Sequence, residues 1–212
     1  MPKRAVVLLS GGIDSATCLY LAKRNGFTPC CLVFDYGQRH RREIESAKKI
    51  AQRAKAKFLV CKIGFPWKGS SLLERKLKIP RRSRGIPSTY VPARNIIFLS
   101  FALSYAEAIK AEAIFIGANA RDFSGYPDCR PNFYRVFRNV AKTGIKNKGI
   151  RILTPLISKS KAQIIKLGQN LNAPYELSWS CYRGGKRPCG VCDSCRFRRK
   201  GFRQAGVKDP LL

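Results

Sequence analysis

The residues whose types and spacing predict chemistry most directly form the string Ser10-Gly11-Gly12-Ile13-Asp14-Ser15. Its two glycines allow the backbone to approach a ligand closely, and its serines supply hydroxyl donors. If the string joins a strand to a helix, the N–H groups at the helix start point at one spot and form an anion site. A plain turn with Asp14 or Ser15 as a helix cap is the alternative. We favour a phosphate-binding loop, because the complete string directly follows an apolar run.

A second set of reactive residues is a group of four cysteines near the C-terminus. Cys181, Cys189, Cys192 and Cys195 fall within fifteen residues, and glycines between them supply sharp turns. Four thiolates at about 2.3 Å make a closed tetrahedral site for a structural Zn²⁺. Flanking arginines and lysines offset the negative charge and favour the thiolate form. An iron–sulfur cluster is the rival interpretation, and unligated thiols are a third.

The charge of the chain is extreme, with 42 Lys and Arg against 12 Asp and Glu and a net charge of +30. Such a field favours polyanions, so contact with nucleic acid is one interpretation. A solvated basic surface is the other, and the ligand of a phosphate-binding loop also needs positive charge. No apolar run approaches the roughly 18 residues that span a bilayer, and the short apolar run at 5–9 is no signal peptide. We therefore expect a cytoplasmic protein without membrane association.

Apolar runs alternate with helical patterns, and these elements must position the reactive residues. Strands are expected at 5–9, 28–35, 57–62, 113–117 and 150–153. Helices are expected at 14–25, 39–55, 93–111, 133–142 and 158–171, the last with Ser158 as its N-cap. This order predicts an α/β fold, with a Rossmann-like parallel sheet and helices on both faces. The loop at 10–15 then lies beyond the carboxyl ends of the strands, where ligands bind in such sheets.

Two segments break the alternation. Residues 64–92 are rich in glycine, proline and basic residues, which predicts a long connection over the sheet edge and a mobile lid. The tail is rich in Cys, Gly, Arg and Pro, so it buries little alone and needs a metal to staple it. We therefore divide the 212 residues into an ATP-binding α/β domain, 1–173, and a C-terminal zinc-binding segment, 174–212.

The loop string resembles the PP-loop of the ATP pyrophosphatases, which adenylate a substrate and release pyrophosphate and have an adenine nucleotide alpha hydrolase-like fold. The resemblance implies that Asp14 helps to hold Mg²⁺ near the phosphates of ATP. It also implies a nucleotide site lined by Leu8, Leu9, Ser10, Gly11, Gly12, Ile13, Asp14, Ser15, Ala16, Thr17 and Cys18.

Further strings extend the resemblance to one family over nearly the whole chain. They are Y-G-Q-R-H at 36–40, Y-V-P-A-R-N at 90–95, G-A-N at 117–119, S-G-Y-P-D-C-R-P at 124–131, S-W-S-C-Y at 178–182 and C-G-V-C-D-S-C at 189–195. They are similar to those of the 7-cyano-7-deazaguanine synthases of the queuosine and archaeosine pathways. The resemblance implies an ATP-dependent ligase that converts 7-carboxy-7-deazaguanine and ammonia to the nitrile through adenylated intermediates. Its cofactors would be ATP, Mg²⁺ and Zn²⁺.

The resemblance also directs attention to individual side chains. Lys161 matches a family lysine that meets the phosphates of ATP, and a solvated helix lysine is the alternative. The catalytic candidates are Asp14, Ser15, Arg94 and Lys161. The substrate-binding candidates are Arg94, Asn95, Asn119, Asp122, Asp128 and Arg130. Asp128 could bind the guanine-like edge and Arg130 a carboxylate, with a structural role as the alternative for both. The alternatives are a helix cap for Asn95 and a surface ion pair for Arg94.

Two other functions compete with the nitrile synthase. A PP-loop enzyme that modifies tRNA directly, by thiolation or lysidine-type ligation, would use the same ATP site, but 212 residues leave little room for an RNA-binding domain. A non-enzymatic basic zinc module would have no use for a complete ATP loop. The expected partners are therefore the small molecules 7-carboxy-7-deazaguanine, ATP and ammonia. A homodimer stays open, and nucleic acid is compatible with the charge but not required.

Overall fold

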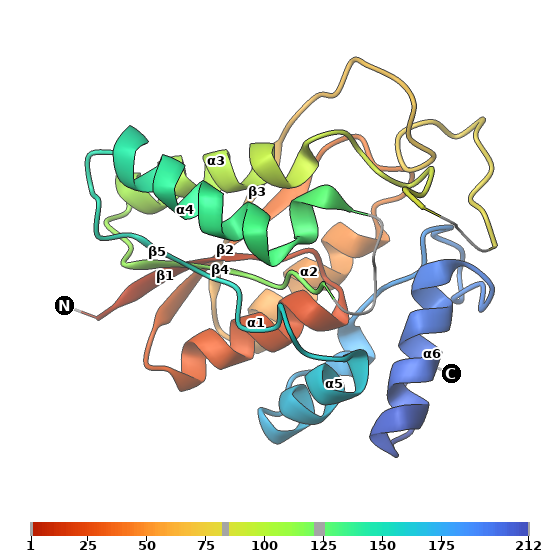
Figure 1. Ribbon diagram of the computed structural model, residues 1–212. Coiled ribbons are helices and arrows are strands. Elements are labelled where there is room, and N and C mark those ends of the chain that lie inside the picture. The colour runs from red at the N-terminus through yellow and green to blue at the C-terminus, as the bar shows by residue number, and fades with distance from the viewer. Residues whose placement is uncertain (1, 82–84, 121–125, 212) are drawn as a thin grey trace.

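The structure is a computed structural model that describes residues 2–81, 85–120 and 126–211 (Figure 1). Its centre is a five-stranded parallel sheet with the order β3-β2-β1-β4-β5. The strands are β1 (Arg4–Leu8), β2 (Thr28–Asp35), β3 (Lys57–Lys62), β4 (Ala113–Ile116) and β5 (Arg151–Leu153). All five expected strands are present, and the predicted Rossmann-like parallel α/β fold is confirmed.

Helices cover both faces of this sheet (Figure 1). The α-helices are α1 (Ile13–Arg24), α2 (Arg42–Arg53), α3 (Arg94–Ala108), α4 (Pro131–Gly144), α5 (Lys161–Asn170) and α6 (Asp193–Ala205). One core lies between the sheet and α1, α2 and α5, and a second core lies between the sheet and α3 and α4. Because side chains alternate along a strand, Val7 packs in the first core and Val6 in the second. Burial on both sides explains why β1 is apolar almost throughout.

The helix α5 begins later than the sequence suggested. Its N-cap is Ser160, whose Oγ accepts a hydrogen bond from Gln163 N at 3.3 Å. Gln163 Oε1 in turn accepts one from Ser160 N at 2.8 Å, which completes a capping box. The prediction of Ser158 as the cap was wrong, because Ser160 is the serine with a glutamine three positions later.

The C-terminal segment packs on the α/β part at the carboxyl ends of the strands (Figure 1). It contains a short turn of 3₁₀-helix (Tyr175–Leu177) and α6, which lies against α5. Phe202 and Ala205 of α6 are buried in the same core as Leu19 and Ile165. The sequence analysis missed α6, since its exposed positions are largely basic and only a narrow apolar stripe faces inward.

Candidate active site

The loop between β1 and α1 has the geometry of an anion site. Ser10 N and Ser10 Oγ both donate to Ser15 Oγ, at 3.2 and 3.1 Å, and Ser15 Oγ donates to Gly12 O at 3.0 Å. Gly12 is the N-cap of α1 and is extended, and no side chain of the described residues caps this helix start. The alternative of a plain turn capped by Asp14 or Ser15 is therefore not what the structure contains. The first N–H groups of α1 and its dipole remain directed at the space in front of the loop.

The backbone at Gly11 explains why the loop needs glycine. Its φ is +81°, and an added Cβ would lie 2.3 Å from Glu43 O and 2.8 Å from Ala47 N. A side chain there would be strained and would also push α2 away from the loop. The start of α2 is thus pressed against the loop, which fixes Glu43 beside it.

Asp14 and Lys161 meet in front of the loop although they lie on α1 and α5. Lys161 Nζ is 2.7 Å from both carboxylate oxygens of Asp14, and the two side chains are only 16% and 24% exposed. Gly201 of α6 gives the lysine stem room, since a Cβ at that position would lie 2.3 Å from Lys161 Cγ. Lys161 is therefore a packed and paired residue and not a solvated helix lysine. The structure thus brings two of the catalytic candidates, Asp14 and Lys161, together in front of the loop.

A cavity of about 350 Å³ opens from the loop, over the carboxyl ends of β1, β2 and β4. Most of the predicted site residues line it, namely Leu8, Leu9, Ser10, Gly12, Ile13, Asp14, Ser15, Arg94, Asn95, Asn119 and Lys161. Others of the predicted set do not line it, namely Gly11, Ala16, Thr17, Cys18, Asp128 and Arg130. Asp122 lies outside the described residues.

Two residues of the predicted set that do not line the cavity, Cys18 and Thr17, have identifiable roles in the fold. Cys18 is fully buried in the core, and this burial raises the pKa of its thiol far above that of a free cysteine. Thr17 Oγ1 donates to Ile13 O at 2.9 Å and is 2.7 Å from Tyr175 Oη, which ties α1 to the C-terminal segment. Arg130 is exposed at the start of α4.

Asp128 serves the start of α3 instead of pointing into the cavity. It is 6% exposed and lies in a 3₁₀-turn (Pro127–Cys129), and its Oδ2 accepts a hydrogen bond from Asn95 N at 3.1 Å. Asn95 Nδ2 donates back to Asp128 O at 3.3 Å and contacts Cys129 Sγ at 3.4 Å. The two residues therefore lock the described part of the 124–131 string, residues 126–131, onto α3, while Asn95 also borders the cavity.

An aromatic wall with one arginine forms the side of the cavity beyond the loop. The rings of Phe34 and Phe98 stack with centroids 3.9 Å apart and an interplanar angle of 6°, and Tyr36 meets Phe98 edge-on at 5.5 Å. The guanidinium of Arg94 lies 5.6 Å from the Tyr36 ring and donates to Tyr36 Oη at 3.2 Å. Arg94 is thus held in the cavity by a ring and a hydroxyl, and among the described residues it does not form the surface ion pair considered as its alternative.

Glu43, the second residue of α2, also lines the cavity, and the sequence analysis missed it. Within the described residues its carboxylate forms neither a hydrogen bond nor an ion pair. Burial raises the pKa of Glu43 to about 7; the charge of Arg94 lowers it, and Cys181 adds to the rise. A signal was available, because Glu43 lies three positions after the Y-G-Q-R-H string, at the helix start that follows β2. That position belongs to the same sheet edge as the PP-loop.

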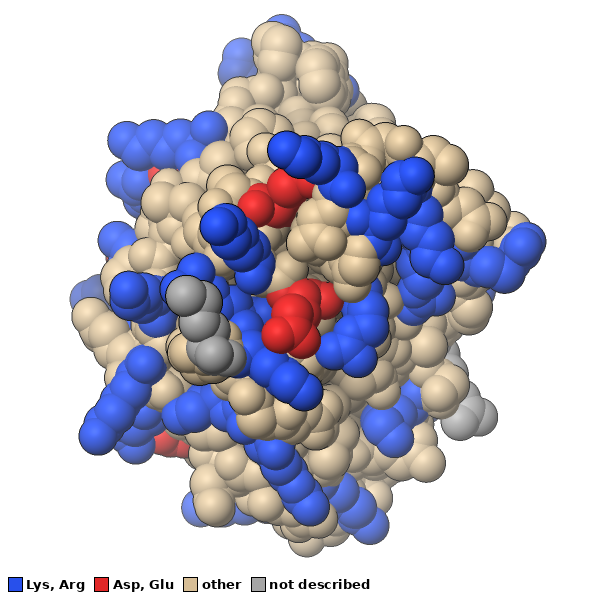
Figure 2. Space-filling view, turned by 90° about the vertical axis from the view of Figure 1, so that its left-hand side faces the viewer, with Lys and Arg blue, Asp and Glu red and all other residues tan. Residues whose placement is uncertain are grey.

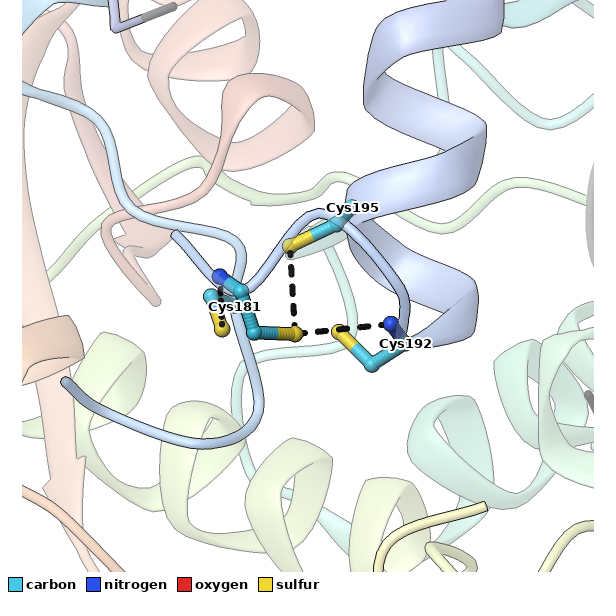
Figure 3. A group of neighbouring side chains, drawn as sticks. Cys181, Cys192 and Cys195 are labelled. Atoms are coloured by element: carbon cyan, nitrogen blue, oxygen red, sulfur yellow. Dashed lines mark hydrogen bonds between the residues drawn. The ribbon is translucent and has the colours of Figure 1, made fainter. Parts of the chain in front are cut away.

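The four cysteines converge at the N-terminus of α6. Figure 3 shows the side chains of Cys181, Cys192 and Cys195 directed toward one another. Their sulfur atoms all lie within 4.8 Å of one another, and Cys189 Sγ is 4.0 Å from Cys195 Sγ. Backbone N–H groups of Arg183 and Cys189 donate to Cys181 Sγ at 3.4 and 3.3 Å. Hydrogen bonds from the Cys192 and Cys195 side chains are the main cause that holds the pKa of Cys181 far below that of a free thiol. Four free thiols gathered this closely, with N–H donors to sulfur, fit a metal that takes four thiolates.

The cysteine segment also forms part of the cavity. Trp179 and Tyr182 line it, and Trp179 N donates to Gly11 O at 2.9 Å. Arg198 of α6 forms a buried ion pair with Asp209 at 2.7 Å and donates to Ser178 Oγ at 2.8 Å. The C-terminal segment is therefore fastened directly to the PP-loop. The shape of the cavity depends on this segment being folded in place.

A parallel sheet that presents an S-G-G-x-D-S loop to a cavity at its carboxyl edge defines a PP-loop, ATP-utilising protein. Solved structures with this fold include the NMN synthetase of Francisella tularensis, 15% identical with a TM-score of 0.52 over 98% of this chain and 79% of that one. A 4-thiouridine synthetase, in a complex with RNA and ATP, is 18% identical with a TM-score of 0.52 over 96% of this chain and 50% of that one. At these identities the likeness concerns the fold alone.

The chain belongs to the family described as Queuosine biosynthesis protein QueC, whose model matches residues 4–206. A 7-cyano-7-deazaguanine synthase of Acetivibrio thermocellus is 53% identical over 99% of this chain and 97% of its own length. One of Thermoplasma volcanium is 49% identical over 100% of this chain and 91% of its own. None of the helices in the described part of the chain has the length and apolar character needed to cross a bilayer.

Proposed function

We propose that this chain is an ATP-dependent 7-cyano-7-deazaguanine synthase that converts 7-carboxy-7-deazaguanine and ammonia to the nitrile. The observation that carries the proposal is the composition of the single cavity described above. The cavity combines a phosphate-binding loop with the Asp14–Lys161 pair, Glu43 beside that loop, and an aromatic wall with Arg94 beyond it. Membership of the QueC family supports the same activity. ATP as the co-substrate favours a cytoplasmic location.

The reaction requires that both oxygens of a carboxylate leave, and each is a poor leaving group in water. In the first half, a carboxylate oxygen attacks the α-phosphorus of ATP, and pyrophosphate departs. Ammonia then attacks the acyl carbon, AMP leaves with that oxygen, and a proton is lost to give the amide. In the second half, the amide oxygen attacks the α-phosphorus of a second ATP and pyrophosphate departs. AMP then leaves with that oxygen, and the nitrogen loses both of its protons to form the C≡N bond.

The loop end of the cavity supplies charge where charge develops. The N–H groups at the start of α1, with the Ser10 and Ser15 hydroxyls, would bind the phosphates of ATP. Lys161 would exchange its contact with Asp14 for one with the oxygens of the departing pyrophosphate. The phosphate groups carry more negative charge than one carboxylate, so they would attract the ammonium group more strongly. Asp14 would then be released as an oxygen ligand for Mg²⁺, an ion that offsets phosphate charge when it is bound. The ion pair in the structure would thus keep both side chains in place until the nucleotide binds.

The aromatic end of the cavity suits the planar base. Tyr36 and Phe98 offer faces and edges against which a deazapurine can pack. Arg94 would meet the negatively charged carboxylate, and Glu43 would accept hydrogen bonds from N1–H and the exocyclic amine of the guanine-like edge. Glu43 is better placed for this task than Asp128, because Asp128 is engaged with Asn95 and does not line the cavity.

Zn²⁺ is the metal that we propose for Cys181, Cys189, Cys192 and Cys195, since four thiolates close a tetrahedral site and leave no position for a substrate. Its role would be structural. By binding the four sulfurs it would hold the segment that carries Trp179 and α6 against the PP-loop.

The proposal is tested by incubating the protein with ATP, Mg²⁺, ammonium and 7-carboxy-7-deazaguanine and analysing the products by mass spectrometry. The expected products are the nitrile, AMP and pyrophosphate, with the amide as a transient intermediate. Asp14→Asn serves as the inactive control. If the intact protein forms no nitrile but releases AMP when tRNA is added, the chain modifies tRNA directly and the proposal is wrong.

A further inference from the structure

The edge of the sheet opposite the cavity carries an unusual concentration of cations. The helices α1, α2, α3 and α4 each precede the next strand, so their C-termini and the strand starts meet at this edge. Figure 2 views the molecule from the side of the N-terminus and shows Lys and Arg over much of the visible face. Apart from Arg53 at the end of α2, which pairs with Glu176, the exposed basic residues of these strand starts and helix ends are Lys3, Arg4, Lys23, Arg24, Lys55, Lys57, Lys110, Lys142, Lys146, Lys148 and Arg151. We call these eleven residues the amino-end surface.

Carboxylates within the molecule do not neutralise the amino-end surface. The acidic residues in the same turns are Glu107 and Glu112, and Glu107 Oε1 already accepts a hydrogen bond from Asn147 N at 2.7 Å. In the part of the chain that the structure describes, none of the eleven cations forms an ion pair. Within these described ranges, Arg4 and Lys23 are the members of the set with side-chain hydrogen bonds, to the backbone oxygens of Ile109 and Ala54.

Helix dipoles explain only a small part of this charge. Each helix C-terminus carries roughly −0.5 of an elementary charge, so four helices supply about −2 at this edge. The hydrogen bond from Lys23 to Ala54 O is an example of a cation that offsets the partial negative charge of a helix C-terminus. Eleven cations and two carboxylates leave a side-chain charge of about +9, so most of it has no counterpart in the fold.

The proposed reaction does not need these cations either. The five residues of β1 separate the amino-end surface from the PP-loop, and at about 3.3 Å per residue this is roughly 16 Å. Salt screens charges over about 8 Å at physiological ionic strength. The amino-end surface therefore contributes little to the binding of ATP or of an acidic substrate at the other edge.

We infer that the amino-end surface binds the phosphate backbone of a nucleic acid. A polynucleotide presents closely and regularly spaced phosphates, and a broad field of unpaired Lys and Arg gains affinity by displacing their counterions. Exposed polar residues among the cations, such as Asn25, Thr28 and Asn147, can donate or accept hydrogen bonds at a sugar–phosphate backbone. Phe58 and Val140 are exposed near Lys57 and Lys142, so an anionic membrane, which binds apolar anchors among cations, is the alternative that the test must exclude. The inference is independent of the proposed activity, because the two sites lie at opposite edges.

The test compares two variants that lose the same charge at different places. The first replaces Arg24, Lys57, Lys146 and Lys148 by glutamine, four exposed cations of the amino-end surface without side-chain hydrogen bonds. The control replaces Lys48, Lys49, Lys166 and Lys200 by glutamine, which are exposed on the flanks of α2, α5 and α6. Binding of full-length proteins to an unmodified tRNA transcript and to a DNA duplex of similar length is measured by fluorescence anisotropy over a range of salt concentrations.

The wild-type protein is expected to bind at least one of the two probes, and the amino-end variant to bind it roughly tenfold or more weakly at 0.15 M salt. The slope of log K against log salt should fall by roughly 3, since four phosphate contacts are lost. The two probes decide whether RNA or DNA is preferred. Equal weakening by the control would mean that only total charge matters and would overturn the inference. So would no binding to either probe, or binding to phosphatidylserine vesicles alone.

Catalysis gives the second readout of the same experiment. The amino-end variant should keep the melting temperature and the kcat and KM values of the wild-type protein, because none of its four positions borders the cavity. If turnover falls in parallel with nucleic-acid binding, the substitutions have disturbed the fold as a whole. That result would contradict the proposal that the amino-end surface is a separate binding site. If the protein forms no nitrile but the amino-end variant still loses nucleic-acid binding selectively, the inference stands and only the proposed function fails.

Discussion

At the carboxyl end of the sheet three cations each meet a specific side chain, whereas at the amino end most cations of the amino-end surface are exposed to solvent. Lys161 contacts Asp14, Arg94 contacts Tyr36, and Arg198 contacts Asp209. Among the eleven residues of the amino-end surface, no cation forms an ion pair with a described carboxylate. Directional contacts fix individual atoms, which chemistry on a small molecule requires. A broad field without such contacts fixes no atom, which suits a repeating polyanion.

Among substitutions at the carboxyl end of the sheet, loss of the metal site should cause the largest decrease in stability and activity. Cys192→Ser removes one of four ligands, so we expect roughly 4 kcal/mol or more of lost stability, no bound metal and no turnover. Metal content by elemental analysis and thermal melting measure this. Cys61→Ser, on the edge strand outside the cluster, is the control and should retain metal and activity. One zinc per chain is expected in the wild-type protein, and iron in its place would replace the zinc assignment by an iron–sulfur cluster.

The Asp14–Lys161 pair should give the next largest effect. Lys161→Met removes the cation expected at the phosphates, so kcat should fall by roughly 10²–10³-fold, as when one preorganised charge is lost at a transition state. Steady-state kinetics measure it, with Lys166→Met on the same helix as the control. Turnover within threefold of the wild-type value would show that Lys161 only pairs with Asp14 and has no role in the reaction.

The glycine at the turn of the loop separates backbone strain from close packing. Gly11→Ala meets both a positive φ and the carbonyl of Glu43, so we expect a loss of roughly 2–3 kcal/mol of stability and a large rise in KM for ATP. Gly26→Ala has a similar φ of +79° but no atom within 4 Å of its Cβ. It should cost only about 1 kcal/mol and leave KM unchanged. Equal effects in denaturant unfolding would mean that packing against α2 is unimportant.

Glu43 should give the smallest but most specific effect. Glu43→Gln keeps its size but replaces one acceptor oxygen by a donor, so KM for 7-carboxy-7-deazaguanine should rise roughly 10- to 100-fold, while KM for ATP stays the same. The exposed neighbour Glu45→Gln is the control. A rise in KM for ATP, or a fall confined to kcat, would assign Glu43 to the nucleotide or to proton transfer.

The pH dependence of the wild-type protein tests the same residue. A carboxyl group with a pKa of about 7 is protonated below pH 7 and then loses one acceptor. Arg94 and Cys181 are the neighbouring charges that act on it besides burial. We therefore expect kcat/KM for the deazaguanine to fall up to tenfold per pH unit as the pH drops below 7. The Glu43→Gln protein should lack this limb, and a profile that is unchanged in the variant would contradict the assignment.

The sequence allowed correct prediction of the features that depend on residues close together along the chain. The five strands are short apolar runs, the loop is a complete string, and the four cysteines lie within fifteen residues. It could not predict contacts between distant residues, such as Gly201 against Lys161 or Asp128 with Asn95. Asp128 looked like a substrate carboxylate because its loop lies at the correct edge, but its oxygen faces the start of α3. Glu43 was missed because only the packing of α2 on Gly11 brings it into the cavity.

The central claim is that one cavity adenylates the substrate twice, and an isotope experiment tests it most directly. The substrate is labelled with ¹⁸O in both carboxylate oxygens, and AMP and the nitrile are analysed by mass spectrometry. The account predicts two molecules of AMP per nitrile, each with one ¹⁸O. Each adenylation transfers one labelled carboxylate oxygen to the phosphate group of the AMP that leaves. Unlabelled AMP, or label recovered in water or pyrophosphate, would contradict it.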